Sequence, residues 1–194
     1  MTKAKKKTSA KFVIAGGFGV GKTTFVGSVS EIDPLRTEAA MTTAGAKVDD
    51  ASKVSTKTTT TVAMDFGRIT IDDDLVLYIF GTPGQERFGF MWDDLATGAL
   101  GAVVLADSRR LADCFYAVDY FEERNIPFVV AVNQFDGKSP HQLEAIKDAL
   151  QLPEEVLVLH CDARDKSSVK DVLLALFGVI LNRMKADKEQ LTAS

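Results

Sequence analysis

Cysteine and histidine are too scarce in this sequence to build a disulfide framework or a histidine-rich metal centre. The 194 residues contain two cysteines, Cys114 and Cys161, and two histidines, His141 and His160, with no metal-ligand spacing. Such cysteine usage is typical of a reducing cytosol, so we expect a cytoplasmic protein. No apolar run approaches the roughly 18 residues of a membrane span, so the sequence predicts no integral membrane segment.

An excess of basic charge is also absent. The chain has 23 basic and 27 acidic residues and a net charge of −4, so the composition predicts no nucleic-acid partner. Hydrophobic residues make up 46% of the chain, enough for one soluble domain with a full core. We expect residues 1–10 to form a disordered basic tail, residues 11–185 the domain and residues 186–194 a frayed end. The alternative for the lysine-rich tail is a weak electrostatic tether to an acidic surface or partner.

The stretch Gly16 to Thr23, GGFGVGKT, fits the phosphate-binding pattern G-x-x-x-x-G-K-[ST]. It follows the apolar run Phe12 to Ala15 and leads into a segment that can open a helix. The glycines let backbone N–H groups turn towards an anion, and the helix N-terminus adds its dipole. The motif predicts that Lys22 reaches the β- and γ-phosphates of a nucleotide and that the Thr23 hydroxyl binds Mg²⁺.

Strand and helix patterns alternate along the chain. The expected strands are 11–16, 62–71, 75–80, 100–106, 127–132 and 156–159, and the expected helices are 21–29, 109–123, 140–150 and 167–184. Apolar runs without alternation indicate strands buried on both faces, whereas strands 62–71 and 75–80 form an antiparallel hairpin around Asp72-Asp73-Asp74. The predicted fold class is therefore three-layer α/β, with a mostly parallel six-stranded sheet, one antiparallel edge strand and helices on both faces.

Residues 31–60 form a long polar connection with no clear period. At roughly thirty residues it is well above the usual length of about 4–6, which indicates a functional segment. It ends in the threonine-rich run 56–61, TKTTTT. This run is either a β-prone loop edge or a switch in which one threonine closes over Mg²⁺ and the γ-phosphate; the upstream phosphate loop favours the switch.

Three further loops follow predicted strands: Gly81-Thr82-Pro83-Gly84-Gln85, Asn133-Gln134-Phe135-Asp136 and Asp162-Ala163-Arg164. With the phosphate loop, and in this order, they make the chain similar to the Ras-like small GTPases from Lys11 to Met184. They correspond to that family's D-x-x-G-Q, N-K-x-D and S-A-K motifs, and Thr61 to Phe66 resembles its T-x-x-x-D-F. The resemblance implies the P-loop small-GTPase fold, Mg²⁺ as cofactor, and GTP and GDP as ligands.

The resemblance also implies roles for individual residues. Gln85 would orient the attacking water, Lys22 and Thr61 would act on the γ-phosphate, and Thr23 and Thr61 would bind the metal. The implied phosphate-binding residues are Gly17, Phe18, Gly19, Val20, Gly21, Lys22, Thr23, Thr24 and Gly84. Arg87, two residues after Gln85, is either an accessory arginine in cis or a solvated surface charge.

The implied guanine-binding residues are Asn133, Gln134, Asp136, Ala163 and Arg164. Asp136 can accept hydrogen bonds from the guanine N1–H and 2-amino group, a donor pair that adenine lacks. Asn133 would tie the base loop to the phosphate loop, and the Ala163 N–H would donate to guanine O6.

Three positions depart from the family pattern. Gly81 stands where the family has an aspartate that holds Mg²⁺ through water, and Asp107, at the end of the next core strand, is a candidate substitute. Phe18 stands where Ras-like members carry a small glycine, so its ring should obstruct an arginine finger supplied in trans and slow hydrolysis. Gln134 replaces a lysine that stacks along the base, which predicts weaker nucleotide affinity.

The G-T-P-G-Q motif, the long threonine-rich segment and Met91-Trp92-Asp93-Asp94-Leu95 resemble the small GTPases of actinomycete conservon operons. The missing aspartate also resembles the bacterial Mgl-type GTPases. These resemblances imply a cytoplasmic signalling switch that reaches the membrane only peripherally, through partners. The implied partners are a guanine nucleotide, a roadblock-type regulator and a sensor-kinase-like protein.

Three functions remain open from the sequence. The main hypothesis is a GTP-binding switch with slow Mg²⁺-dependent hydrolysis. The second, motivated by Gly81 and Phe18, is a nucleotide-dependent binding module with little or no hydrolysis. The third is a P-loop ATPase or kinase, against which Asn133 and Asp136 argue.

Overall fold

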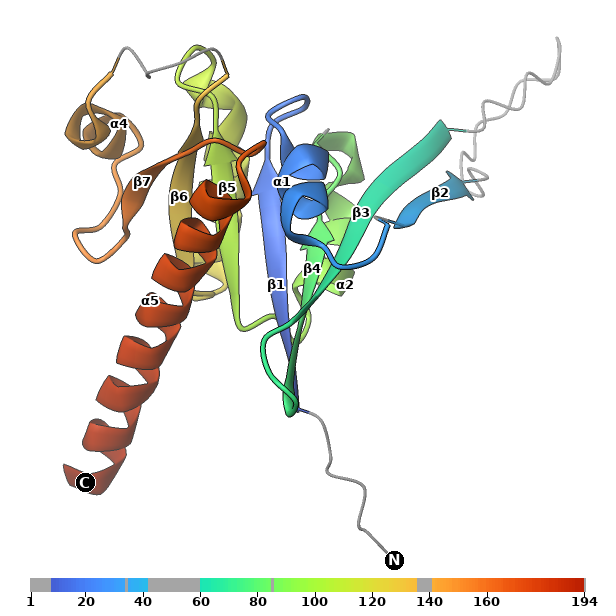
Figure 1. Ribbon diagram of the computed structural model, residues 1–194. Helices are drawn as coiled ribbons and strands as arrows, with labels where there is room; N and C mark the ends of the chain where they lie inside the picture. The colour runs from blue at the N-terminus through green and yellow to red at the C-terminus, as the bar shows by residue number, and fades with distance from the viewer. Residues whose placement is uncertain (1–7, 34, 42–59, 85, 136–140, 194) are drawn as a thin grey trace, which may run out of the picture.

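In the computed structural model, residues 8–33, 35–41, 60–84, 86–135 and 141–193 are described, and they form an α/β sandwich around one sheet (Figure 1). The strands are β1 (Thr8–Gly16), β2 (Leu35–Met41), β3 (Thr60–Thr70), β4 (Leu75–Gly81), β5 (Gly101–Ala106), β6 (Phe128–Asn133) and β7 (Val158–Cys161). The helices are α1 (Lys22–Val29), α2 (Trp92–Ala96), α3 (Phe115–Glu123), α4 (Leu143–Ala149) and α5 (Lys166–Ala193), with 3-10 turns at Glu86–Met91 and Leu111–Cys114.

The described part of the sheet has seven strands in the order β2-β3-β4-β1-β5-β6-β7. Strands β4, β1, β5, β6 and β7 pair in parallel, whereas β3 runs antiparallel to both β4 and β2. The predicted fold class, a mostly parallel sheet with one strand of opposite direction, is confirmed. The antiparallel strand is not at the edge, however, because β2 adds a seventh strand outside it.

Helices cover both faces of the sheet. On one face α1 and α5 bury Phe25, Val26 and Leu176 against alternate residues of β1 such as Phe12 and Ile14. On the other face α2, α3 and α4 pack against the intervening residues, including Val13, Ala15 and Val104. Because both faces are covered, the covered parts of the central strands are almost entirely apolar, as in residues 12–16 of β1 and 128–132 of β6, which is the pattern that predicted a parallel sheet.

Four segments differ from the sequence-based expectations. Strand β2 lies within the long connection; its sequence, LRTEAAM, has little β-branched or aromatic character, so it gave no strand pattern. Strand β1 begins at Thr8, within the expected tail, because residues 8–10 pair with β4. Helix α5 continues to Ala193 because KADKEQLTA contains neither glycine nor proline. The expected helix 109–123 is divided into a 3-10 turn and α3.

The two cysteines are free and buried, as expected for a chain without disulfides. Burial raises the pKa of Cys114 to about 12 and that of Cys161 to about 11. Over the described residues, no helix combines the length and the apolar character that crossing a membrane would need.

Helix α5 supplies a large part of the core on its face, and this leads to a stability prediction. Leu176 is fully buried beneath β5, whereas Leu174 on the same helix is 66% exposed. We expect Leu176→Ala to lower the free energy of unfolding by about 2–5 kcal/mol, because it leaves a cavity. Leu174→Ala, the matched control, should change it by less than about 0.5 kcal/mol. Urea denaturation followed by circular dichroism measures both, and equal effects would contradict this packing.

Candidate functional site

The loops that carry the motifs meet at one edge of the sheet. The parallel strands β1, β4, β5, β6 and β7 all end at this edge, which lies at the top of Figure 1. In an open α/β sheet, ligands bind in the crevice outside the carboxyl ends of the strands. The phosphate loop, the G-T-P-G segment and the described residues of the two predicted base loops therefore share the edge where such a fold binds ligands.

The phosphate loop joins β1 to α1 and is packed closely against neighbouring strands. Gly16 has φ +135°, and a Cβ there would lie 2.3 Å from the carbonyl oxygen of Leu105 in β5. Gly21 has φ +106°, and a Cβ there would lie 2.7 Å from Nδ2 of Asn133. Both positions need glycine for conformation and for space, so the motif's glycines are explained by the packing of the loop.

Lys22 is the first residue of α1, and its side chain is 8% exposed. Its Nζ donates to the carbonyl oxygens of Gly16 at 2.8 Å and Gly17 at 2.7 Å. Burial lowers the pKa of Lys22 to about 8, and the nearby charge of Asp65 opposes part of this shift. A cation held away from water interacts more strongly with an anion, which suits this amine to phosphate binding.

The G-T-P-G segment after β4 lies against the phosphate loop. A Cβ on Gly84 would be 2.6 Å from Lys22 Nζ and 2.9 Å from Phe18 Cα, so only glycine fits there. The segment is anchored from the other side, where the indole Nε1 of Trp92 in α2 donates to the carbonyl oxygen of Pro83 at 3.3 Å.

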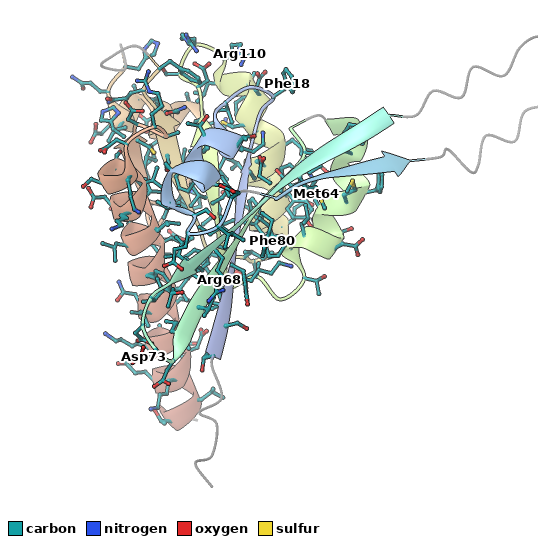
Figure 2. The ribbon with its side chains drawn as sticks, turned by 45° about the vertical axis from the view of Figure 1, so that its right-hand side comes forward. Phe18, Met64, Arg68, Asp73, Phe80 and Arg110 are labelled. Atoms are coloured by element: carbon teal, nitrogen blue, oxygen red, sulfur yellow. The ribbon has the colours of Figure 1, made fainter. Side chains whose placement is uncertain are left out.

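Phe18 extends from the phosphate loop into solvent with 68% of its surface exposed. Arg110 Nη2 donates to the Phe18 carbonyl oxygen at 3.1 Å, and the two residues lie side by side at the top of the molecule (Figure 2). Arg110 also forms ion pairs with Asp107 at 3.7 Å and Asp113 at 3.5 Å. A guanidinium therefore borders the phosphate loop from within the same chain.

The hydroxyl of Thr23 donates to Oδ2 of Asp65, in β3, at 2.7 Å. Asp65 is 7% exposed. Asp107, the carboxylate that the sequence suggested as the substitute for Gly81, accepts hydrogen bonds from the Arg109 backbone N–H, Nε and Nη2 at 2.8–3.0 Å. These bonds hold the pKa of Asp107 below its ordinary value. The neighbouring arginines thus contact the Asp107 carboxylate, whereas Thr23 contacts Asp65, and the metal role suggested for Asp107 stays a prediction.

Asn133, at the end of β6, connects the phosphate loop to the last predicted base loop. Its Nδ2 donates to the Val20 carbonyl oxygen at 2.8 Å, and its Oδ1 accepts from the Ala163 backbone N–H at 3.0 Å. The side chain is 8% exposed, so both hydrogen bonds are sheltered from water. One amide thereby fixes the distance between two loops that are far apart in sequence.

Arginines also border the predicted base loops. Arg164 binds both carboxylate oxygens of Asp162 at 2.9 Å, which lowers the pKa of that carboxyl, and its Nη2 lies 3.4 Å from the Gln134 carbonyl oxygen. The guanidinium carbon of Arg109 lies 4.3 Å from the centre of the Phe135 ring. These contacts hold the guanidinium groups of Arg109 and Arg164 at the rim of the edge, each paired with an aspartate.

Several predicted site residues cannot be placed by side chain. Gln85 and Asp136 lie outside the described residues. Thr61 lies in β3, where its backbone pairs with Ala40, and the side chains of Thr61 and Arg87 are not described. The remaining phosphate-loop residues, Gly17, Gly19, Val20 and Thr24, lie with Lys22 between β1 and the first turn of α1.

Sequence reasoning missed the contact between Asp65 and Thr23. A signal was present, because the β3–β4 hairpin is symmetric about Asp73, so that position 65 falls opposite position 81. The role of Arg110 had no comparable signal, because an arginine in a loop after a strand is common on protein surfaces.

The residues at this edge can hold a magnesium ion together with a nucleotide. In the described residues, no group of three or more histidine, cysteine, aspartate or glutamate side chains could bind a metal by itself. Magnesium at phosphates commonly uses one or two protein groups and takes its other ligands from phosphate oxygens and water. The Thr23 hydroxyl and the Asp65 carboxylate, in contact beside the phosphate loop, fit that requirement.

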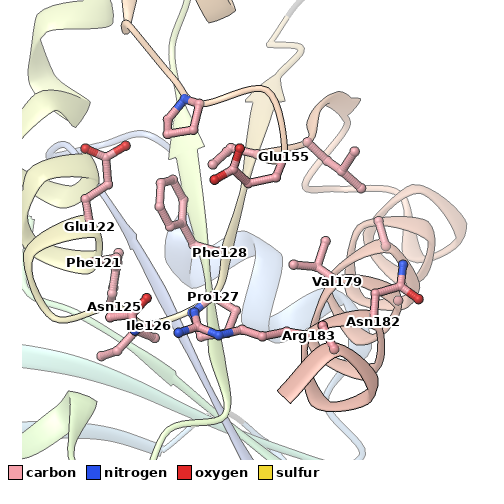
Figure 3. A pocket seen from close by; sticks show the side chains of 16 residues that line it. Phe121, Glu122, Asn125, Ile126, Pro127, Phe128, Glu155, Val179, Asn182 and Arg183 are labelled. Carbon is pink, nitrogen blue, oxygen red and sulfur yellow. The ribbon is translucent and has the colours of Figure 1, made fainter. Parts of the chain in front are cut away.

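A separate cavity of about 970 Å³ lies at the opposite end of the sheet (Figure 3). It is bordered by the start of β6, the end of α3 and the second half of α5, including Phe121, Ile126, Phe128, Val179 and Arg183. None of the residues predicted for nucleotide binding lines it. The cavity is at the amino ends of the strands, so it is distinct from the edge that carries the motifs.

Comparisons with known proteins agree with this geometry. A sequence pattern for a family described as "Conserved hypothetical ATP binding protein" matches residues 14–183. The chain is 31% identical to the uncharacterized protein MJ1339 of Methanocaldococcus jannaschii over 133 residues, which cover 68% of this chain and 73% of that protein. It is 29% identical to translation initiation factor IF-2 of Rickettsia felis over 141 residues, covering 66% of this chain and 17% of that factor.

Among solved structures, the G-domain of FeoB from Methanococcus jannaschii has the same fold. The TM-score is 0.60 at 13% identity, and the match covers 89% of this chain and 98% of that one. The fold is therefore that of a P-loop GTPase domain.

The buried position of Lys22 predicts a pH dependence of stability. Its pKa in the folded protein, about 8, lies below that of the unfolded chain, so burying the charge costs stability at every pH below about 8. That cost disappears between pH 8 and about 10.5, where only the unfolded chain still carries the proton. Over this pH range, the free energy of unfolding of the wild type should therefore rise by up to about 3 kcal/mol relative to that of Lys22→Met.

Urea denaturation of both proteins across this pH range measures the difference. Lys170→Met, at an exposed position on α5, is the control and should follow the wild-type curve. A constant difference between wild type and Lys22→Met from pH 8 to 10.5 would contradict the lowered pKa.

Proposed function

Because this chain belongs to the family described as conserved hypothetical ATP-binding proteins and has a P-loop GTPase fold, we propose that it is a GTP-binding switch with slow Mg²⁺-dependent hydrolysis. The observation that carries the proposal is the Asn133 side chain, whose two hydrogen bonds connect the phosphate loop to the Ala163 loop. This connection would hold the proposed phosphate and base sites at a fixed separation, as the binding of one nucleotide requires.

The choice of GTP over ATP depends on the loop that begins at Asn133. Asp136, three residues later, offers a carboxylate to the N1–H and 2-amino group of guanine, and adenine would leave that carboxylate without donors. The backbone N–H of Ala163 donates to Asn133 Oδ1. In the complex it would donate to O6 of the base instead, or to both acceptors at once. ATP, the ligand in the family's description, is the alternative substrate.

The residues that contact the phosphates would act mainly through charge and position. Lys22 would exchange its two carbonyl acceptors for phosphate oxygens, and the backbone N–H of Gly84, which lies next to Lys22, would meet the γ-phosphate. Gln85, the residue after Gly84 in the sequence, would orient the attacking water. Magnesium, when bound by Thr23 and the phosphates, would supply positive charge to the leaving group.

Slow hydrolysis follows from two features of the same edge. The Phe18 ring is exposed, and it would obstruct an arginine that a partner protein brings to the γ-phosphate. Gly81 brings no carboxylate to the metal. These features also favour the second candidate, a nucleotide-dependent binding module with little or no hydrolysis. In either case the bound nucleotide would control the affinity of the chain for protein partners in the cytoplasm. By resemblance, these partners are a roadblock-type regulator and a sensor-kinase-like protein.

Base recognition can be tested by changing what Asp136 offers. Wild type should bind GTP at least about 100-fold more tightly than ATP, because adenine leaves the carboxylate unpaired. Asp136→Asn replaces one acceptor with an amide donor, so it should weaken GTP binding and strengthen binding of xanthosine triphosphate, whose C2 carbonyl accepts. Fluorescent-nucleotide titration in Mg²⁺ measures these affinities. Asp148→Asn, an exposed change in α4, is the control, and tighter ATP than GTP binding by wild type would overturn guanine recognition.

Catalysis can be separated from binding by a change at Gln85. If Gln85 positions water, Gln85→Leu should slow single-turnover phosphate release at least about tenfold with little change in GTP affinity. Gln142→Leu, at the exposed start of α4, should leave the rate unchanged. An unchanged rate in Gln85→Leu, or no phosphate release by wild type, would support the binding module instead.

A further inference from the structure

The missing carboxylate at position 81 has a counterpart on the neighbouring strand. Strands β3 and β4 are antiparallel, and their register places Asp65 directly opposite Gly81. Residues opposite each other in an antiparallel pair project their side chains from the same face of the sheet. The Asp65 carboxylate therefore projects from the same face of the sheet, and from the same position along it, as a carboxylate at position 81 would.

Space, rather than backbone conformation, explains the glycine at position 81. Gly81 is absent from the glycines with positive φ, so an ordinary residue could adopt its backbone angles. A Cβ at this position would lie 3.0 Å from the Asp65 Cβ and 3.1 Å from its Oδ2. The Asp65 side chain thus fills the volume that a side chain at position 81 would need.

The Asp65 carboxylate points to the metal-binding part of the phosphate loop. Its Oδ2 accepts the hydroxyl proton of Thr23 at 2.7 Å, and its charge is close enough to Lys22 to oppose the lowering of that lysine's pKa. The side chain is 7% exposed. A carboxylate has two acceptor oxygens, so one that accepts from a single neutral hydroxyl can still accept hydrogen bonds from the water molecules around a cation.

We propose that Asp65 provides, from β3, the carboxylate that holds the water shell of Mg²⁺, and that position 81 is a glycine because it leaves room for the Asp65 side chain. The proposal rests on the nucleotide-binding function proposed above. It deepens that function, because the metal carboxylate then belongs to the strand that begins at Thr60 and carries Thr61, four residues earlier. The carboxylate that binds the metal and the end of the threonine-rich segment would then lie on the same strand.

The test measures cation affinity directly. Mn²⁺ is titrated into the complex of the full chain with GDP and followed by electron paramagnetic resonance, alongside the rate of fluorescent GDP release in EDTA. Asp65→Asn keeps the size and an acceptor for Thr23 but removes the charge, so Mn²⁺ affinity should fall about 10- to 100-fold. GDP release in EDTA should stay within about twofold of wild type, which a merely structural defect would not allow. Asp119→Asn, exposed on α3, is the matched control.

A relocation variant makes the test specific. Gly81→Asp alone should express poorly or unfold at lower temperature, because its side chain meets Asp65. Combined with Asp65→Ala, which clears that volume, it should recover Mn²⁺ affinity to within about tenfold of wild type.

Wild-type Mn²⁺ affinity in Asp65→Asn, or a larger loss in Asp107→Asn than in Asp65→Asn, would overturn the assignment while leaving the nucleotide site intact. A wild-type protein that binds no GDP, or binds it without any effect of Mn²⁺ or Mg²⁺, would overturn the proposed function itself.

Discussion

The phosphate loop is packed against the carboxyl ends of β5 and β6 with no room for an additional methyl group. The contacts of Gly16 with the Leu105 carbonyl and of Gly21 with the Asn133 amide leave no space for a Cβ. The loop is therefore positioned by the most buried strands of the sheet rather than by its own sequence. A site built on rigid strands keeps its geometry more closely than one built on free loops. The placement of Lys22, Thr23 and Gly84 follows from this contact.

The polar groups that this molecule buries are gathered at the same edge. Among the described residues, the buried polar or charged side chains are Lys22, Asp65, Thr82, Asp107 and Asn133. Burying such groups costs stability unless each finds partners, and the partners here are loop carbonyls, a hydroxyl and two arginines. The hydroxyl of Thr82 has no hydrogen-bond partner in the described part of the chain. Concentrating this cost at one place is what a binding site requires, because those groups must later face a charged ligand.

Much of the fold was predictable from the sequence, for a physical reason. Strands covered on both faces are mostly apolar, as are β4, β5, residues 12–16 of β1 and residues 128–132 of β6. Strand β2 was not predictable, because its sequence has little β-branched or aromatic character and its pairing with β3 leaves no local pattern. The end of α5 was missed because residues 185–193 have high helix propensity but no apolar period.

The site was predictable where a motif specifies local chemistry, and less so where it depends on pairing across the sheet. The phosphate loop and Asn133 belong to the first kind. The contacts of the two candidate carboxylates for the position left by Gly81 belong to the second, because proximity to a strand end suggested Asp107 but did not reveal which groups each carboxylate meets. Arg109 binds Asp107, and Thr23 binds Asp65.

The hairpin register gives the turn at Asp72 to Asp74 an unexpected importance. This turn lies at the far end of β3 and β4, about 25 Å along the strand from Asp65, and its own hydrogen bonds, from the Asp74 and Leu75 N–H groups to Asp72 Oδ1, concern only local structure (Figure 2). Yet a shift of one residue in the pairing would carry Asp65 to the opposite face of the sheet. An insertion or deletion in this exposed turn would leave the site intact only if the turn or a bulge absorbed it without shifting the pairing of β3 with β4. The pairing that this surface turn helps to set is thus tied to chemistry at the other end of the molecule.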